Sequence, residues 1–293
     1  INGGDAENRL ALAQAREQMA QVAVCRGQGP QPDLDRAIEE VRRAIAINPK
    51  EAQAHREEAL IVLTLGKLRE STGHDPAREF EAANASFARA LAINPNDAVI
   101  LAEFSDARRT QGLVAEQSGG EPLEAYTDAL KHADRALAVS PSLLDAWIAR
   151  ARARSTLAIW KAQRGKAADA DFEAALQDFG HAIDLHPQDW RAWHNRGLVR
   201  QNTAVLRKTP ASEVMELLKD FDRAVELNRA SSMAWRDRGL ARLNAAQVKN
   251  DDRKLTEMAL ADLDQALKLN RRDVEVWKSR GSAHTAMAVS LEV

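Results

Sequence analysis

The stretch FDRAVELNRASSMAWRDRGLAR, residues 221–242, repeats the pattern of FGHAIDLHPQDWRAWHNRGLVR, residues 179–200. Both begin with phenylalanine, carry an alanine three residues later, and place a tryptophan and then an Arg-Gly pair near the end. The two copies lie 42 residues apart. Self-similarity at a fixed period indicates a repeat architecture, in which each copy buries its apolar face against its neighbours.

Six copies can be aligned on a landmark that follows a polar residue. The landmarks are Pro49, Pro95, Pro141, Pro187, Arg229 and Arg271, at steps of 46, 46, 46, 42 and 42 residues. Five residues before them stand Ala44, Ala90, Ala136, Ala182, Ala224 and Ala266, and eight before them Val41, Phe87, Ala133, Phe179, Phe221 and Leu263. Twelve before them stand Ala37, Ala83, Ala129, Ala175, Leu217 and Ala259. Offsets of three and four place these columns on one face of a helix.

A second helix follows each landmark. Six residues after it the column reads His55, Leu101, Trp147, Trp193, Trp235 and Trp277, and small residues four positions later let a neighbouring helix approach closely. Proline ends the preceding helix, and Asp or Ser often starts the next one. The pattern predicts helices over 5–26, 33–48, 51–70, 77–94, 97–117, 122–140, 143–164, 167–186, 189–206, 211–228, 231–248, 253–270 and 273–291.

The alternation of small and large residues, closed by "NP", resembles the tetratricopeptide repeat (TPR) family over essentially the whole chain. "AWHNRGLVR" and "FDRAVELN" are similar to variants in bacterial arrays, including arrays attached to larger signalling proteins. The resemblance implies an all-α, right-handed α-solenoid, a single array over 1–293. Its repeats are expected at about 5–48, 51–94, 97–140, 143–186, 189–228 and 231–270, with an unpaired helix at 273–291.

The repeat length departs from the family's usual period of about 34 residues. The spacing from landmark to tryptophan is constant, so the extra length lies between the first and second helix of each hairpin. We expect about one added turn in each helix. The four further residues of the longer copies are expected to enlarge polar loops such as "STGHDPAR" and "EQSGGEP".

Composition narrows the function. The net charge is −2, from 41 basic and 43 acidic residues, which gives no general attraction to nucleic acid, and no long apolar run predicts membrane insertion. The single cysteine, Cys25, excludes an internal disulfide. No phosphate-binding loop, nucleophile set or metal-ligand spacing occurs, so we expect no enzyme activity, cofactor or metal site. No compartment is indicated beyond a slight preference for the cytoplasm.

In the resembled family the first helices line a concave groove that binds an extended peptide. The groove positions are expected 4, 7, 11, 14 and 15 residues after each landmark. The last of these forms a polar ladder of Thr64, Thr110, Thr156, Asn202 and Asn244 that could bind a peptide backbone. With the basic positions, the candidate peptide-binding residues are Arg56, Arg109, Thr110, Arg152, Thr156, Arg191, His194, Asn202, Arg236 and Asn244. Their charge favours an acidic partner, and ordinary solvated surface is the alternative for both sets.

Other recurring residues are interpreted as architecture. Arg150, Arg196 and Arg238 occur only in hairpins that also carry Asp178, Asp220 or Asp262, which predicts Arg–Asp pairs between helices. The tryptophan column is expected to pack in the core. Trp160 and Trp190 lie outside that column and are the better candidates for exposed contacts.

The resulting hypothesis is a scaffold that binds a protein or peptide. Two alternatives remain open: self-assembly through exposed end repeats and loops, and service as the regulatory array of a larger bacterial signalling enzyme. A start at Ile1 without an initiator methionine, and a last helix that keeps the interior pattern, suggest a fragment of a longer protein. The sequence does not name the partner, the oligomeric state or the pathway.

Overall fold

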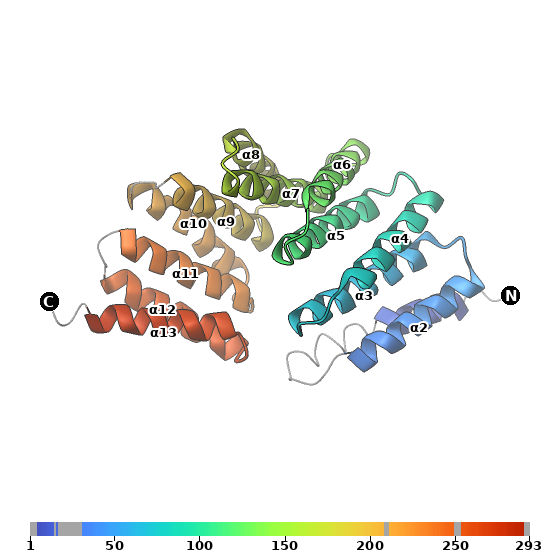
Figure 1. The fold of residues 1–293 in the computed structure, drawn as a ribbon, viewed down its shortest axis with the longest axis horizontal. Helices are drawn as coiled ribbons and strands as arrows, with labels where there is room; N and C mark the ends of the chain where they lie inside the picture. The colour runs from blue at the N-terminus through green and yellow to red at the C-terminus, as the bar shows by residue number, and fades with distance from the viewer. Residues whose placement is uncertain (1–4, 15, 17–30, 208–210, 249–252, 290–293) are drawn as a thin grey trace. The chain divides into compact units, whose positions relative to one another are not determined.

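The computed structural model of the chain describes residues 5–14, 16, 31–207, 211–248 and 253–289, and these residues form helices and short connections with no strand among them. Residues 5–14 form a first helical segment, and the rest of the predicted helix 5–26 lies outside the described residues apart from residue 16. The later helices are α2 (Gln31–Ile47), α3 (Ala52–Ser71), α4 (Ala77–Ile93), α5 (Ala98–Gln117), α6 (Leu123–Val139), α7 (Leu144–Gln163), α8 (Asp169–Leu185), α9 (Trp190–Arg207), α10 (Ala211–Leu227), α11 (Ser232–Val248), α12 (Arg253–Leu269) and α13 (Val274–Val289) (Figure 1). The all-α fold class is confirmed, and the predicted bounds of these twelve helices agree to within two residues.

The second helices of the pairs all have the same length, whereas the described lengths of the first helices differ. Every second helix of a pair, from α2 to α12, has 17 residues. The first helices α3, α5 and α7 have 20 residues, whereas α9 has 18 and α11 has 17. Because α9 and α11 end next to residues outside the described ranges, the expectation that loops carry the four-residue difference between the copies stays a prediction.

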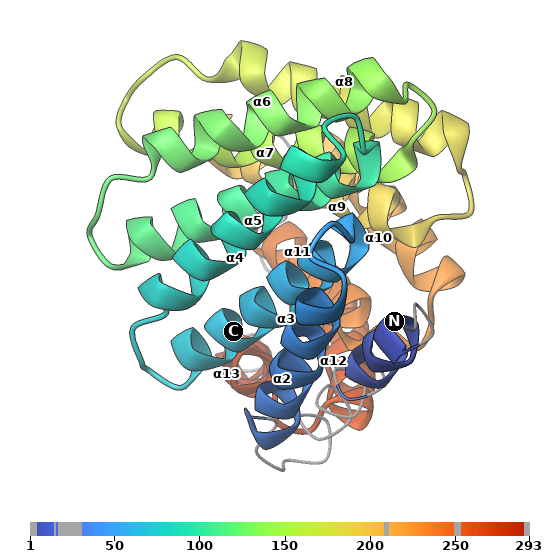
Figure 2. The same cartoon turned by 90° about the vertical axis from the view of Figure 1, so that its right-hand side faces the viewer.

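The chain packs as two compact units, residues 1–153 and 154–293, and their boundary falls within α7. In the first unit α3 packs against α2, α4 and α5, and in the second unit α11 packs against α9, α10, α12 and α13. Consecutive helices of each unit lie side by side as antiparallel pairs (Figures 1 and 2). The single array over 1–293 and its right-handed course remain predictions.

The three apolar columns of the second helices form the core of each unit. All eighteen of their residues are buried, and the large members Phe87, Phe179, Phe221 and Leu263 are fully so. Small residues of the first helices meet them: a Cβ added to Gly197 would stand 3.1 Å from the Phe221 ring, and one added to Gly239 would stand 3.1 Å from Leu263. Stacking therefore buries the apolar faces as the sequence predicts.

The turn between pairs is the same in every copy. The amide of the residue before each landmark, such as Asn94, donates to the carbonyl of the column alanine, here Ala90, at 2.9 Å. The next helix is capped by a side chain: Asp97 accepts from the amides of Val99 and Ile100 at 3.0 and 3.1 Å. The predicted start after Asp or Ser is confirmed for α5, α9, α11 and α13, whereas α7 begins before Asp145 and α3 follows Glu51 without a side-chain cap. Capping of this kind stabilises a helix by about 1 kcal/mol.

Each tryptophan of the column donates a hydrogen bond to the turn that precedes its helix. Trp147, Trp193, Trp235 and Trp277 donate from Nε1 to the landmark carbonyl six residues earlier, at 2.7, 3.0, 2.8 and 2.9 Å. An arginine three residues after each tryptophan lies over its ring, with Cζ to centroid distances of 4.8, 4.9, 4.7 and 5.6 Å. The first three tryptophans are half-buried and Trp277 is half exposed, so the column combines packing with a hydrogen bond and a cation–π contact.

Those arginines also hold the helices together. Arg196 binds Asp220 through Nε and Nη2 at 3.0 and 2.7 Å, and Arg238 binds Asp262 in the same way at 2.9 and 2.6 Å. These two predicted pairs are confirmed. In the remaining hairpin Arg150 binds Asp134 at 3.1 Å.

A second arginine, one turn further along the first helix, binds the predicted aspartate in each of these hairpins. Its members are Arg154 with Asp178, Arg200 with Asp220 and Arg242 with Asp262, at 2.8, 2.9 and 2.7 Å. The sequence reasoning missed this column, although the four-residue spacing between the two arginines was visible in it. Asp220 and Asp262 thus each face two guanidinium groups that neutralise their charge.

Candidate peptide-binding face

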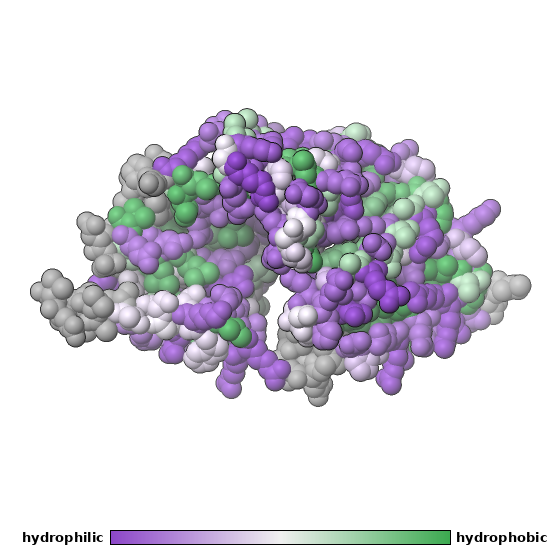
Figure 3. Space-filling view, in the orientation of Figure 1, coloured by the Kyte–Doolittle hydropathy of each residue, from purple (hydrophilic) through white to green (hydrophobic). Residues whose placement is uncertain are grey.

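The positions predicted to contact a peptide lie on the first helices, and we call their common surface the first-helix face. In the first unit it runs over α3 and α5, and in the second over α9, α11 and α13, which pack against one another in sequence. The visible surface in Figure 3 is largely hydrophilic with smaller hydrophobic patches. The question is therefore which of the polar side chains on this face are available to a partner.

In the first unit the basic residues of the face are paired. Arg56 of α3 binds Glu103 of α5 through two nitrogens, with its Nε 2.6 Å from Oε2. The hydrogen bond to Glu103 raises the pKa of the Arg56 guanidinium against the opposing effect of burial. The pair links consecutive first helices and leaves little net charge for an acidic partner.

Asp106 neutralises the next two arginines. It accepts from Arg109 at 3.3 Å on the same helix and from Arg152 at 2.9 Å. Arg109 is buried, and burial together with the nearby charge of Arg152 lowers its pKa. These two predicted peptide-binding arginines therefore already have a carboxylate partner within the chain.

The second unit carries a corresponding buried pair. His194 of α9 lies with Nε2 2.8 Å from Oδ2 of Asp237 on α11, and both side chains are buried. Arg236 binds Asp237 at 2.7 Å and Asp273 at 3.3 Å. Burial alone would raise the pKa of Asp237, but hydrogen bonds from His194 and Arg236 hold it below its usual value.

Arg191 is the most accessible of the predicted basic residues. Its guanidinium binds Asp189, which also caps α9 by accepting from the Arg191 amide at 2.8 Å. The side chain of Arg191 remains exposed.

The polar ladder divides into two kinds of residue. Thr110 donates its hydroxyl to the Asp106 carbonyl of its own helix at 2.8 Å, Thr64 does the same to Leu60 at 2.9 Å, and Thr156 is half-buried. Asn202 and Asn244 are exposed. The amide donors and acceptors on this face that a peptide backbone could reach are therefore those of the second unit.

Aliphatic residues flank these two asparagines one turn before and one turn after. On α9 they are Leu198 and Leu206, and on α11 they are Leu240 and Val248. Leu206 is 47% exposed and Val248 is 48% exposed, while Leu198 and Leu240 are half-buried. The sequence reasoning missed this stripe, although its spacing of four residues on both helices was visible. We call the six residues the Leu/Asn stripes.

Two predicted exposed tryptophans behave differently. Trp160 is only 4% exposed, and Arg164 and Lys166 lie over its ring, so the prediction of an exposed contact was wrong for it. Trp190 is half-buried with its ring centroid 5.6 Å from that of His194. Within the described residues no group of three His, Cys, Asp or Glu side chains could hold a metal ion, and no helix is long and apolar enough to cross a bilayer.

Comparison with solved structures places this arrangement among known folds. TTC0263, a thermophilic TPR protein from Thermus thermophilus, aligns with 78% of this chain and 99% of its own, at 20% sequence identity and a TM-score of 0.56. PilW, a type IV pilus biogenesis factor, aligns with 91% of this chain and 97% of its own, at 17% identity and a TM-score of 0.51. No protein-family model and no curated protein sequence matches the chain. The chain therefore has the fold of TPR proteins.

Proposed function

We propose that the chain is a protein-interaction scaffold that binds an extended peptide segment across α9 and α11 of the second unit. The observation that carries the proposal is the pair of Leu/Asn stripes, the same three-residue pattern repeated on two adjacent helices. Packed helices lie about 8–10 Å apart, and an extended peptide rises about 3.3 Å per residue. Asn202 and Asn244 are thus spaced to contact backbone amides about three residues apart.

The flanking side chains indicate what the peptide carries. Leu206 and Val248 are exposed beside the asparagines and favour apolar side chains at the neighbouring peptide positions. The arginines of the face are paired, so a general acidic character of the partner is expected to contribute less than the amides and the apolar contacts. A preference for an acidic side chain near Arg191 stays a prediction.

The test begins with selection of displayed random peptides on the full chain, followed by calorimetric titration of the enriched peptides. Removal of a hydrogen-bonding side chain costs about 0.5–1.5 kcal/mol. We therefore expect Asn202→Ala and Asn244→Ala each to weaken binding by about 2–10-fold. Gln177→Ala, which removes an exposed side-chain amide from α8 outside the face, serves as the matched control. Unchanged peptide affinity in both asparagine variants would contradict the proposed binding site.

Self-assembly and service within a larger signalling enzyme remain the alternatives. Light scattering over a concentration series separates the first of these from peptide binding. A chain that stays monomeric at all concentrations and binds a selected peptide supports the scaffold.

A further inference from the structure

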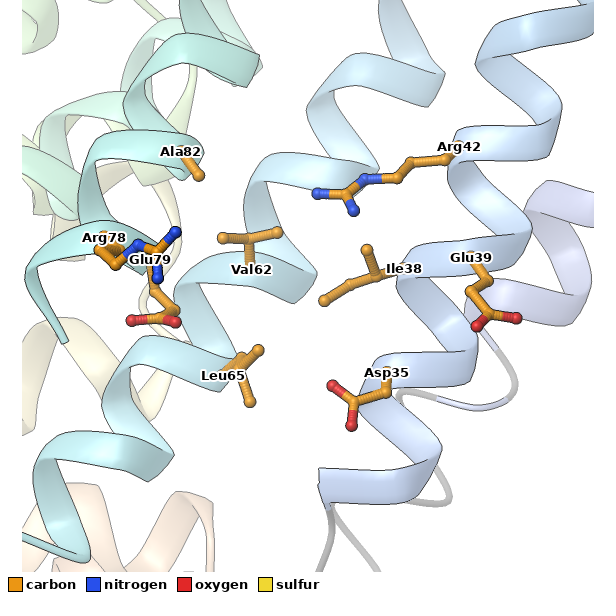
Figure 4. Close-up of a pocket in the computed structure, with 9 residues that line it drawn as sticks. All are labelled: Asp35, Ile38, Glu39, Arg42, Val62, Leu65, Arg78, Glu79 and Ala82. Atoms are coloured by element: carbon orange, nitrogen blue, oxygen red, sulfur yellow. The ribbon is translucent and has the colours of Figure 1, made fainter. Parts of the chain in front are cut away.

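Each unit contains a cleft between two second helices, on surfaces separate from the first-helix face. In the first unit a cleft of about 430 Å³ lies between α2 and α4, with Val62 and Leu65 of α3 at its base (Figure 4). In the second unit a cleft of about 460 Å³ lies between α10 and α12, with Arg242 of α11 at its base. Volumes of this size are typical of sites that bind ligands.

The two clefts occupy the same repeat position. Counted from the landmarks, eight of the nine residues of each cleft occupy matching positions: Asp35 and Met215, Ile38 and Leu218, Glu39 and Lys219, Arg42 and Asp222, Val62 and Arg242, Arg78 and Lys254, Glu79 and Leu255, and Ala82 and Met258. Leu65 of the first cleft and Glu216 of the second have no counterpart in the other lining. One chain thus contains two versions of one cleft, and their differences show what each version is suited to bind.

The first cleft is polar. Asp35, Glu39 and Glu79 give it three acidic residues, against two basic ones, and Figure 4 shows them on the helices that border the space. Glu79 is bound by Arg69 at 2.8 Å. Ile38, Val62, Leu65 and Ala82 also line this cleft, and about half of its exposed surface is polar.

The exposed surface of the second cleft is mostly apolar, and its charged side chains include two acidic residues, Glu216 and Asp222. Met215, Leu218, Leu255 and Met258 line it, and Met258 is 38% exposed although it lies beside the core residues Leu218 and Leu255. Asp222 accepts from Arg242 at 2.8 Å, which neutralises the charges at its base. On the α10 wall the exposed Lys219 pairs with Glu216 at 2.7 Å, whereas the exposed Lys254 on the α12 wall forms no ion pair with any described residue. Methionine side chains adapt to varied apolar shapes, as binding surfaces require.

We propose that the cleft between α10 and α12 binds an amphipathic helix of a partner protein, with large apolar side chains in the cleft and an acidic residue beside Lys254. The walls are helices and present no free backbone groups, so a partner whose own backbone hydrogen bonds are internally satisfied suits them best. A helix meets this condition and places apolar side chains at i, i+3 and i+4 into the space between two others. Lys254 supplies the charge complementarity.

The test uses a displayed library of amphipathic helices, selected on the full chain and then measured by fluorescence anisotropy as labelled peptides. We expect enriched sequences with apolar residues on one face and Asp or Glu beside them. Met258→Glu is expected to weaken their binding at least tenfold, whereas Ala82→Glu, the same change at the same position of the first cleft, leaves it unchanged. Lys254→Glu weakens binding as well, and Arg78→Glu is its matched control.

Methionine methyl NMR supplies a second readout that does not depend on variants. Met215 and Met258 report the cleft, while Met233 lies on the first-helix face, four residues after its landmark and 45% exposed. The selected helix is expected to shift the first two methyl signals and not the third. A peptide bound at the Leu/Asn stripes is expected to leave the Met215 and Met258 signals unchanged, so either proposal can fail without the other.

Several outcomes would overturn the inference. They are an absence of any enriched helix that depends on Met258, an equal effect of Ala82→Glu, and a peptide that shifts only Met233. Self-association of the chain that Met258→Glu abolishes would assign the cleft to a second copy instead.

Discussion

The strongest structural prediction concerns Asp220, the buried carboxylate that joins α9 to α10. Its side chain is 2% exposed and accepts three charge-assisted hydrogen bonds, two from Arg196 at 3.0 and 2.7 Å and one from Arg200 at 2.9 Å. Removing one partner of a fully buried ion pair costs about 3–5 kcal/mol. Arg196 and Arg200 retain 18% and 38% of their side-chain exposure, so both can regain some water. We therefore expect Asp220→Ala to lower the free energy of unfolding by about 2–4 kcal/mol.

The assay is urea denaturation followed by circular dichroism, with amide hydrogen exchange to locate the loss. Because repeat arrays can unfold in parts, exchange should rise first in α9 and α10. Asp169→Ala is the control, since Asp169 forms an exposed pair with Arg207 and should change stability by less than about 1 kcal/mol. In the Arg196→Met background the cost of Asp220→Ala should fall, which measures the coupling directly. Equal effects of Asp220→Ala and Asp169→Ala would refute the reasoning.

Two further predictions use the packing and the titration of single residues. Gly281→Ala should stabilise α13 by about 1 kcal/mol, because a Cβ there meets no atom within 4 Å. In Gly197→Ala the added Cβ contacts Phe221, so the free energy of unfolding from thermal melts should be about 1–3 kcal/mol lower than that of Gly281→Ala. Burial against Phe104, at 4.2 Å between ring centroids, and then the charge of Arg135 lower the pKa of His132 to about 4. His132 is therefore protonated near pH 6.5 in the unfolded chain but only near pH 4 in the folded chain. The free energy of unfolding consequently falls as the pH drops from 6.5 to about 4. His132→Phe should reduce that loss by about 1–2 kcal/mol after allowance for partial exposure, and an imidazole that titrates near pH 6.5 in the folded chain by NMR would contradict this.

The sequence was sufficient for the helices and the core because both follow from periodicity. An apolar residue at a fixed offset on the second helices, such as Phe221, can lie on only one face of a stacked pair, and all three of these columns are buried. The tryptophan column was expected in the core as well, but Trp147, Trp193 and Trp235 are half-buried and Trp277 is half exposed. Joint variation within one chain also predicted the pairs of Arg196 and Arg238 with their aspartates. The same reasoning applied one turn later would have found Arg200 and Arg242.

The candidate site was harder to predict because pairing between repeats follows a different register. Arg56 stands seven residues after its landmark, whereas its partner Glu103 stands eight after the next one, so a column-by-column comparison does not align them. His194 and Asp237 have the same relation. Positions that look like a basic binding surface in sequence are therefore partly links between helices. Trp160 was misjudged for a related reason, because a residue outside the repeating columns can still be buried by local packing.

The clefts between second helices could not be inferred from the sequence alone. Their existence depends on how far apart α10 and α12 lie, which no residue column specifies. Once the structure shows the cleft, the landmarks give the matched position in the other unit, so that Ala82 becomes the natural control for Met258.

The location of a selected peptide on α9 and α11 tests the central claim most directly. A photo-crosslinking amino acid at Val248, on the Leu/Asn stripe of α11, should form a covalent adduct with the peptide that mass spectrometry identifies. The same amino acid at Gln177, on α8, should form none. An adduct at Gln177 together with none at Val248 would contradict the account.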